Sequence, residues 1–305
     1  MKTRVTLQGT EVTIETGKGQ FEELLVDTRG FRELSNILKD ATGIHLVDSS
    51  KNRSLMASRL NSILRRRGLA GYGVYLKMLL AANNPGILSE FVSALTTNTT
   101  QFFREAPHFG QLKDILPSIL AGKAASDSRE LRVWCAAASS GQEPYSILIT
   151  LLESIDPALY WQLKFLGTDI DADVLARAIG GKYSESEVES LPALYRQKYM
   201  LAHKTRAGTT YEIRREIREK IRFAQLNLIE AFPFQYKFDV IFCRNVLIYF
   251  DSKTGREVVD RLIAALAPGG VLFLGHSESG TMKPGMLPSF AHAAYRKLPG
   301  KGTNR

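Results

Sequence analysis

Two hydrophobic periods follow one another along the chain. From Asp27 to about Leu95, apolar residues recur every three or four positions, as at Phe31, Leu34 and Leu38, which predicts four or five short helices. From about Leu131, short apolar runs alternate with helical stretches, and such runs predict strands. The chain therefore divides into an all-α region and a region in which strands and helices alternate.

The second region carries the pattern of a doubly wound sheet. Five apolar runs predict strands, and a sixth is expected near Ala291 to Leu298; the five are Leu131–Cys135, Leu163–Gly167, Ile221–Gln225, Phe238–Cys243 and Val271–Leu274. Helices are expected between them: one with Pro144 at its first position, one over Asp173–Ile179 and one over Gly255–Leu266. Strands that alternate with helices predict an α/β fold with a mostly parallel sheet.

Two segments depart from this rhythm. Tyr199–Ile217 predicts two polar strands around Ala207-Gly208, a small antiparallel β insertion. Residues 3–16 alternate β-branched and polar side chains, which predicts either a small hairpin or a loose tail. We therefore expect an N-terminal extension (1–20), a helical domain (21–96) and an α/β domain (97–305) whose insertion spans about 198–218.

Composition narrows the class of protein. Hydrophobic residues make up 44% and charged residues 23% of the 305 positions, which excludes collagen-like and wholly disordered chains. Forty basic against 31 acidic residues give a net charge of +9, which favours an anionic partner. Cys135 and Cys243 both lie in apolar runs without metal-ligand spacing, so we expect no metal and a reducing cytoplasm. The N-terminus carries no signal-like apolar segment, and no apolar run is long enough to span a membrane.

The positive charge is concentrated in the helical region. Between Ser49 and Ser89 there are seven basic residues and no acidic one. At 100° per residue, Arg59 and Arg66 project together beside the apolar face of their helix, and Arg65 lies further round. Such a face is either solvated or a docking surface for an acidic partner, and the absence of a compensating carboxylate favours docking.

Candidate ligand groups follow the first two strands of the predicted sheet. Ala136 to Pro144 is a loop of small residues, which is either an ordinary tight turn or a place where a ligand approaches the backbone. Asp169 stands just after the second strand, and a carboxylate at that strand end is able to accept both hydroxyl protons of a ribose. Asp171 or Asp173 is expected to cap the next helix. Together the two loops favour a nucleoside ligand.

Five motifs occur in order along the chain: N-T-T-Q-F-F-R-E (98–105), A-A-S-S-G-Q-E-P-Y-S (137–146), T-D-I-D (168–171), F-C-R-N-V-L-I-Y-F (242–250) and G-H-S-E (275–278). With these motifs the chain, from about Phe31 to Leu298, closely resembles the chemotaxis receptor glutamate O-methyltransferases, the CheR family. The resemblance implies a cytoplasmic enzyme that uses S-adenosylmethionine to esterify receptor glutamates and releases S-adenosylhomocysteine.

The resemblance also implies roles for individual residues. It places these residues at the cofactor: Asn98, Thr100, Arg104, Glu143, Asp169, Asn227, Leu228, Cys243 and Arg244. Arg104 and Tyr249 are implied at the reacting centre, where we expect them to orient the substrate carboxylate. Because a glutamate with a pKa of about 4.3 is already ionised at pH 7, its attack on a methyl group requires no general base.

The same resemblance implies that the partner is the cytoplasmic helical bundle of a chemoreceptor. Arg53, Arg59, Arg65 and Arg66 are implied as the docking residues, in agreement with the cationic face. Relatives that tether to a receptor's C-terminal peptide carry Arg-Gly-x-Gly in the insertion, whereas this chain has Leu201-Ala202-His203-Lys204, so we expect direct docking by a monomer. Two alternatives remain: a non-catalytic sensor of S-adenosylmethionine, and a nucleic-acid methyltransferase, which the basic charge also suits.

Overall fold

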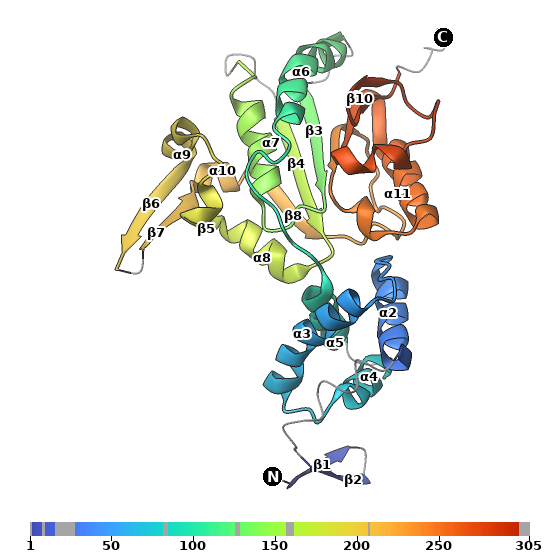
Figure 1. Ribbon diagram of the computed structural model, residues 1–305. Coiled ribbons are helices and arrows are strands. Elements are labelled where there is room, and N and C mark those ends of the chain that lie inside the picture. Colours follow the sequence, from blue (N-terminus) through green and yellow to red (C-terminus); the bar gives the residue numbers. More distant parts are fainter. Residues whose placement is uncertain are drawn as a thin grey trace. The chain divides into compact units, whose positions relative to one another are not determined.

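The computed structural model describes residues 2–7, 10–15, 28–81, 85–125, 129–156, 162–206 and 208–298 (Figure 1). The chain divides into two compact units between Thr97 and Asn98. None of the described helices combines the length and the apolar composition needed to cross a bilayer.

The first unit is helical, as predicted. Its described helices are α2 (Thr28–Thr42), α3 (Ser50–Arg67), α4 (Tyr72–Leu80) and α5 (Pro85–Leu95). Phe31, Leu34 and Phe91, whose spacing predicted helices, are buried. Before α2, strands β1 (Lys2–Leu7) and β2 (Thr10–Glu15) pair antiparallel. Of the two structures predicted for residues 3–16, the hairpin is therefore the one observed. The turn at residues 8–9 lies outside the described residues.

Helix α3 shows how the sequence sets the bounds of an element. Its cap residue Ser49 accepts a hydrogen bond from the N–H of Asn52 at 3.2 Å, which satisfies one of the helix's free donors. The helix ends at Gly68, whose φ of 64° is a left-handed conformation that glycine adopts without strain. Between the caps, Met56, Leu60 and Leu64 bury one face.

The second unit is built on a seven-stranded sheet whose order is β11-β12-β10-β9-β3-β4-β8. Its strands are β3 (Glu130–Ala136), β4 (Gln162–Asp169), β8 (Ile221–Gln225), β9 (Phe238–Cys243), β10 (Leu266–Leu274), β11 (Ser289–Ala291) and β12 (Ala294–Arg296). The strands from β10 to β8 are parallel, and β12 and β11 extend the sheet antiparallel. This confirms the predicted mostly parallel, doubly wound α/β fold.

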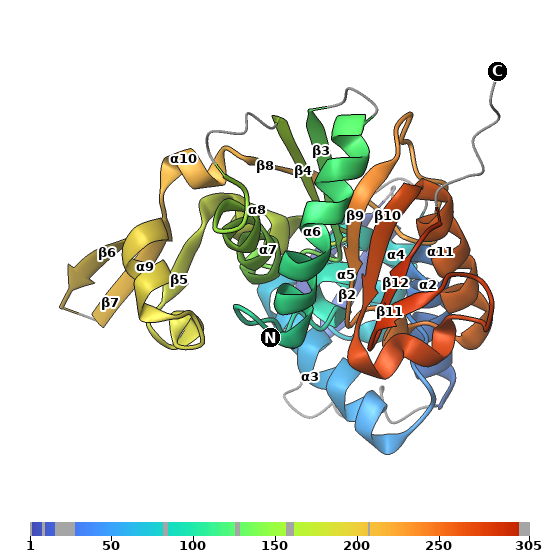
Figure 2. The same ribbon diagram turned by 90° about the horizontal axis from the view of Figure 1, so that it is seen from above.

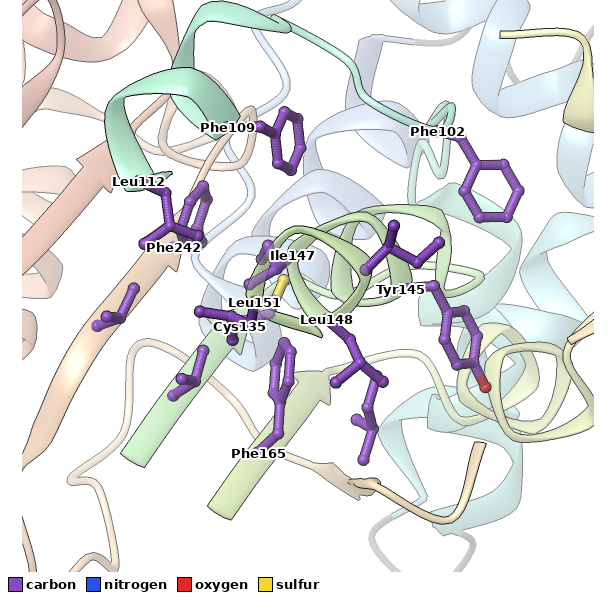
Figure 3. Packing of buried hydrophobic residues seen from close by; sticks show 14 of the residues in the cluster. Phe102, Phe109, Leu112, Cys135, Tyr145, Ile147, Leu148, Leu151, Phe165 and Phe242 are labelled. Carbon is purple, nitrogen blue, oxygen red and sulfur yellow. The ribbon is translucent and has the colours of Figure 1, made fainter. Parts of the chain in front are cut away.

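Helices cover both faces of this sheet (Figure 2). Leu131, Val133 and Cys135 of β3 join a core with α6 (Pro107–Ala125) and α7 (Gln142–Leu152), part of which Figure 3 shows. Trp134 and Ala136 belong to a second core, which α11 (Ser252–Ala265) completes. Because successive side chains of a strand point to opposite faces, β3 contributes to both cores.

Two expected helix boundaries are corrected. The helix placed at Pro144 begins two residues earlier, at Gln142, so Pro144 is its third residue. The structure tolerates this because the first four N–H groups of a helix have no intrahelical acceptor. The helix expected over Gly255–Leu266 is α11, which begins at Ser252 because Asp251 caps it by accepting from the N–H groups of Lys253 and Thr254.

The β insertion is larger than the predicted pair of strands. Strands β6 (Met200–Thr205) and β7 (Gly208–Ile213) pair antiparallel, as predicted, and β5 (Lys182–Ser184) adds a third strand in the order β5-β7-β6. Ala207, in the expected turn, lies outside the described residues. The remaining short elements are α8 (Ala172–Gly180), α9 (Ala193–Tyr199), α10 (Arg215–Arg218) and the 3-10 helices η1 (Ser186–Val188), η2 (Leu247–Tyr249) and η3 (His276–Thr281).

Candidate functional site

The strand order of the large sheet locates the candidate site. From β3 the chain proceeds outward through β4 and β8, and it then returns to the other side of β3 with β9 and β10. Ligands of open α/β sheets bind beyond the carboxyl ends of the strands at such a reversal. The loops after β3, β4 and β9 leave the sheet at this edge, and they contain three of the five sequence motifs.

Backbone strain is concentrated in the loops of this edge. Among the described residues, six that are not glycine have positive φ, and five of these lie in the motifs: Phe103, Glu105, Ala137, Ser139 and Asn245. Such conformations cost about 1–3 kcal/mol each and persist only where the surroundings impose them, which happens most often at functional sites. The strain marks this edge as the functional part of the unit.

Asp169 joins two of these loops. One carboxylate oxygen accepts the N–H of Ser139 at 2.8 Å and the other accepts the N–H of Asp171 at 3.0 Å. Burial raises the pKa of Asp169, although these N–H donors oppose the shift. An ionised carboxylate has about four acceptor positions, and the backbone donors Ser139, Ile170 and Asp171 leave part of that capacity for a hydroxyl group of a ligand.

Asn98 and Asp171 complete this side of the site. The amide of Asn98 donates to Asp171 at 2.9 Å, and the Ser139 hydroxyl donates to the Asn98 carbonyl at 3.1 Å. Asp171 also caps α8 by accepting the N–H of Asp173, as expected. The N-T-T segment is thereby fixed to the loops that follow β3 and β4.

Arg244 is the centre of a buried charge cluster. Its guanidinium is 0% exposed and lies 3.0 Å from Glu143 and 2.9 Å from Glu105, and it donates to the Arg104 carbonyl at 2.7 Å. Burial lowers the pKa of Arg244, but the two carboxylates outweigh this effect and raise it above its ordinary value. The side chains of Arg244 and Glu143, both predicted at the cofactor, are therefore bound to each other.

Glu278 of the G-H-S-E motif shapes the loop after β9. Its buried carboxylate accepts the backbone N–H groups of four residues at this turn: Asn245, Leu247, Ile248 and Gly275. These bonds fix η2, which ends in Tyr249. Neither Glu278 nor Glu105 was assigned a role from the sequence, although both stand in the quoted motifs, because their partners come from distant parts of the chain.

The other predicted site residues lie along the same edge. Cys243 is the buried last residue of β9, and Leu228, in the loop that follows β8, is buried in the second core. Asn227 donates to Glu230 in that loop. Arg104 donates to the Thr99 carbonyl at 2.9 Å, and the half-buried Tyr249 makes no hydrogen bond through its hydroxyl in the described part of the chain.

Carboxylates pair with several of the basic residues of the helical unit. Arg53 pairs with Asp48 at 2.6 Å, and Arg66 and Arg67 both pair with Glu90. The expectation that no carboxylate compensates this stretch is therefore wrong, because the two acidic residues stand just outside the window in sequence but contact it in the fold.

The remaining predicted docking residues differ in exposure. Arg59 donates to the carbonyls of Thr96 at 2.6 Å and Ala94 at 3.3 Å, where it satisfies acceptors at the end of α5. Arg65 is exposed, and its described hydrogen bond is to the Asn61 carbonyl of its own helix at 3.3 Å. The described hydrogen bond of Arg65 thus stays within α3, whereas Arg53, Arg59 and Arg66 bond to groups outside this helix.

The chemistry of the large site is that of binding and orientation. Asp169, the strained small-residue loop and the amino end of α7 suit a nucleoside with a charged substituent. Both cysteines are buried, and burial raises their pKa well above the ordinary value, so neither is a ready nucleophile.

Comparisons with known proteins agree with this chemistry. A family model described as the CheR methyltransferase SAM binding domain matches residues 98–293, and one described as the CheR methyltransferase all-alpha domain matches residues 29–96. A probable chemotaxis protein methyltransferase of Rhizobium etli is 40% identical over 79% of this chain and 89% of its own. The chemotaxis protein methyltransferase of Escherichia coli is 38% identical over 85% of this chain and 87% of its own.

Proposed function

The chain belongs to the CheR methyltransferase family, and from this premise we propose that it converts glutamate side chains of chemoreceptors into methyl esters. Members of this family are S-adenosylmethionine-dependent methyltransferases. The observation that carries the proposal is Asp169 at the end of β4, held against the strained loop after β3 in a chain whose relatives are named chemotaxis methyltransferases.

The residues at the sheet edge suit S-adenosylmethionine, which supplies a methyl group activated by the adjacent sulfonium. Asp169 would accept the ribose hydroxyls, and Asn227 and Leu228 would flank the adenine. Asn98, Thr100, Arg104 and Cys243 would line the rest of the cofactor. We assign Arg244 and Glu143 to a supporting role, because their buried ion pair holds the segment around Arg104 in place.

The substrate carboxylate needs orientation more than activation. A glutamate is ionised at neutral pH, so the protein has only to aim one oxygen at the methyl carbon and to exclude water. Arg104 and Tyr249 suit this task, because a guanidinium and a phenol together donate to a carboxylate. Well-oriented reactants reach effective molarities on the order of 10⁵ M or more, so positioning alone accounts for a large rate enhancement.

We further propose that the helical unit docks directly on the acidic helical bundle of the receptor. Arg65 is the best candidate contact, because Arg53, Arg59 and Arg66 are engaged within the unit. Tethering to a receptor peptide is not proposed, because β6 lacks the Arg-Gly-x-Gly sequence.

Charge reversal tests this docking. Arg65→Glu is expected to raise the KM for receptor about two- to tenfold, because it removes a favourable charge and adds a repulsive one at an interface rim. The KM for S-adenosylmethionine should stay unchanged. Lys220→Glu, an equal charge change at an exposed position of the other unit, serves as the control. Equal effects of the two reversals on the receptor KM would contradict docking through Arg65.

The proposed function is tested by following a radiolabelled methyl group. The protein is incubated with labelled S-adenosylmethionine and either receptor-containing membranes or total RNA, and the products are then treated with mild alkali. Label in a membrane protein that alkali releases as methanol is the expected result, because carboxyl methyl esters hydrolyse under these conditions. Alkali-stable label in RNA would show that the proposed substrate is wrong. Binding of S-adenosylmethionine without methyl transfer to the membranes or to the RNA would favour a non-catalytic sensor.

A further inference from the structure

A cluster of potential metal ligands includes Glu105, the last residue of the strained N-T-T-Q-F-F-R-E segment. Glu105, His108 and His276 each place one ligand atom so that all three atoms lie within 4.8 Å of one another. Oε2 of Glu105 is 3.7 Å from Nδ1 of His108 and 3.8 Å from Nε2 of His276. These separations are too long for hydrogen bonds between the three side chains.

The orientation of His108 points to a missing partner. Its side chain is fully buried, and Nε2 lies 3.2 Å from the carbonyl oxygen of His292. Because a carbonyl only accepts, Nε2 carries the proton and Nδ1 presents a bare lone pair. That lone pair is aimed at the cluster, yet Nδ1 has no hydrogen-bond partner in the described structure. A buried acceptor without a partner is unfavourable, and a metal ion would satisfy it.

Glu105 would contact the ion through Oε2, an oxygen that already accepts two hydrogen bonds. Oε2 also accepts from Arg244 at 2.9 Å and from the His276 N–H at 3.3 Å, and Oε1 accepts from Asn245 at 3.1 Å. Ligand carboxylates in metal sites are commonly held by such outer hydrogen bonds. The charge of Arg244 opposes a cation at this place, and Glu143, which pairs with Arg244 at 3.0 Å, offsets part of that charge.

We propose that Glu105, His108 and His276 bind one divalent transition-metal ion of the Zn²⁺ class. Two imidazoles and one carboxylate are ligands that Zn²⁺, Co²⁺ and Ni²⁺ accept, whereas Mg²⁺ and Ca²⁺ prefer oxygen alone. Ligand atoms at about 2.0–2.1 Å from a tetrahedral ion lie about 3.4 Å apart. The two distances to Glu105 exceed this by a few tenths of an ångström, and the three atoms, which lie within 4.8 Å of one another, would move together when the ion binds.

The ion would connect two segments of the active-site edge. Glu105 follows Arg104 directly, and His276 begins η3, whose Glu278 holds the loop that carries Tyr249. The expectation of no metal came from sequence-local ligand spacing, which does not detect this site because 171 residues separate Glu105 from His276.

Metal binding to the untagged full chain tests the site. The protein is treated with a chelator, the chelator is removed, and Zn²⁺ is titrated calorimetrically, with Co²⁺ absorption as a second probe of the ligands. We expect one equivalent of ion to bind, and His276→Ala and Glu105→Gln to weaken the Zn²⁺ affinity at least about tenfold each. His45→Ala, which removes an exposed histidine of the helical unit, should leave the affinity unchanged.

Two results would overturn the proposal. One is Zn²⁺ binding that His276→Ala and Glu105→Gln leave unaltered, which would place the ion elsewhere. The other is a crystal structure of Zn²⁺-soaked protein that shows a water molecule between the three side chains and no anomalous signal at the zinc edge. Circular dichroism of both variants establishes that any lost affinity does not result from unfolding.

Discussion

Arg244→Met is expected to destabilise the second unit by about 3–5 kcal/mol, because it leaves one buried and one partly buried carboxylate without their countercharge. Glu143 and Glu105 each lie within 3.0 Å of the buried guanidinium. Burial raises the pKa of Glu143 while Arg244 opposes that shift, so removal of the arginine leaves this carboxyl in a site that disfavours its charge. Methionine keeps much of the side-chain volume, so the lost free energy of unfolding reports the missing charge rather than the creation of a cavity.

The free energy of unfolding is to be measured with urea and tryptophan fluorescence. Trp134 is buried in the second unit, so its signal follows the unit that contains Arg244. The matched control is Arg215→Met, which breaks an exposed pair with Glu219 whose side chains are 81% and 61% exposed. That variant should lose less than about 1 kcal/mol, because water screens surface pairs.

A double variant separates charge from packing. Arg244→Met combined with Glu143→Gln is expected to recover part of the lost stability, since one of the two unpaired charges is then absent. If the double variant is as unstable as the sum of the single ones, Arg244 stabilises the unit by packing on Phe109, whose ring centroid lies 5.8 Å from the guanidinium carbon, and not by charge.

Sequence patterns predict the central strands well because these strands are buried on both faces. Phe238–Cys243 was predicted with the bounds of β9, and all six residues are buried. Helix α6 was not predicted, and it contains Gly110, Pro117 and Gly122, which are poor helix formers. Here burial of Leu112, Leu116 and Ile119 against the sheet overrides local propensity. Strand β5 was also not predicted, because its three residues give too short a pattern.

The candidate site was predictable only where position along a strand determines the role. Asp169 comes two residues after the predicted apolar strand Leu163–Gly167 and is the last residue of β4, so the sequence alone places its carboxylate at the binding edge. The partners of Arg244 are 101 and 140 residues away, and no local pattern indicates that it binds Glu143 rather than a ligand. The pairing of Arg66 and Arg67 with Glu90 was missed for the same reason, since it depends on how α3 packs against α5.

Tyr249→Phe is expected to lower kcat for receptor methylation about ten- to a hundredfold. The substitution removes one hydrogen bond to a charged carboxylate, and such bonds contribute about 1.5–3 kcal/mol. The hydroxyl makes no hydrogen bond to the described protein, so its removal should leave the fold and the dissociation constant of S-adenosylmethionine unchanged. Arg104→Ala should lower kcat at least about a hundredfold, because it removes a positive charge that attracts the substrate carboxylate and a donor that orients it.

Steady-state kinetics at saturating receptor, with calorimetric titration of S-adenosylmethionine, provide the measurement. Tyr236→Phe, in an aromatic cluster with Phe234 and Phe238, is the matched control and should retain normal kcat. Because the attacking glutamate has a pKa of about 4.3, kcat should not vary with pH between about 6 and 8 through ionisation of the substrate. A kcat that rises with pH in the parent and becomes flat in Tyr249→Phe would mean that the tyrosine removes a proton, and orientation would then be the wrong account of its role.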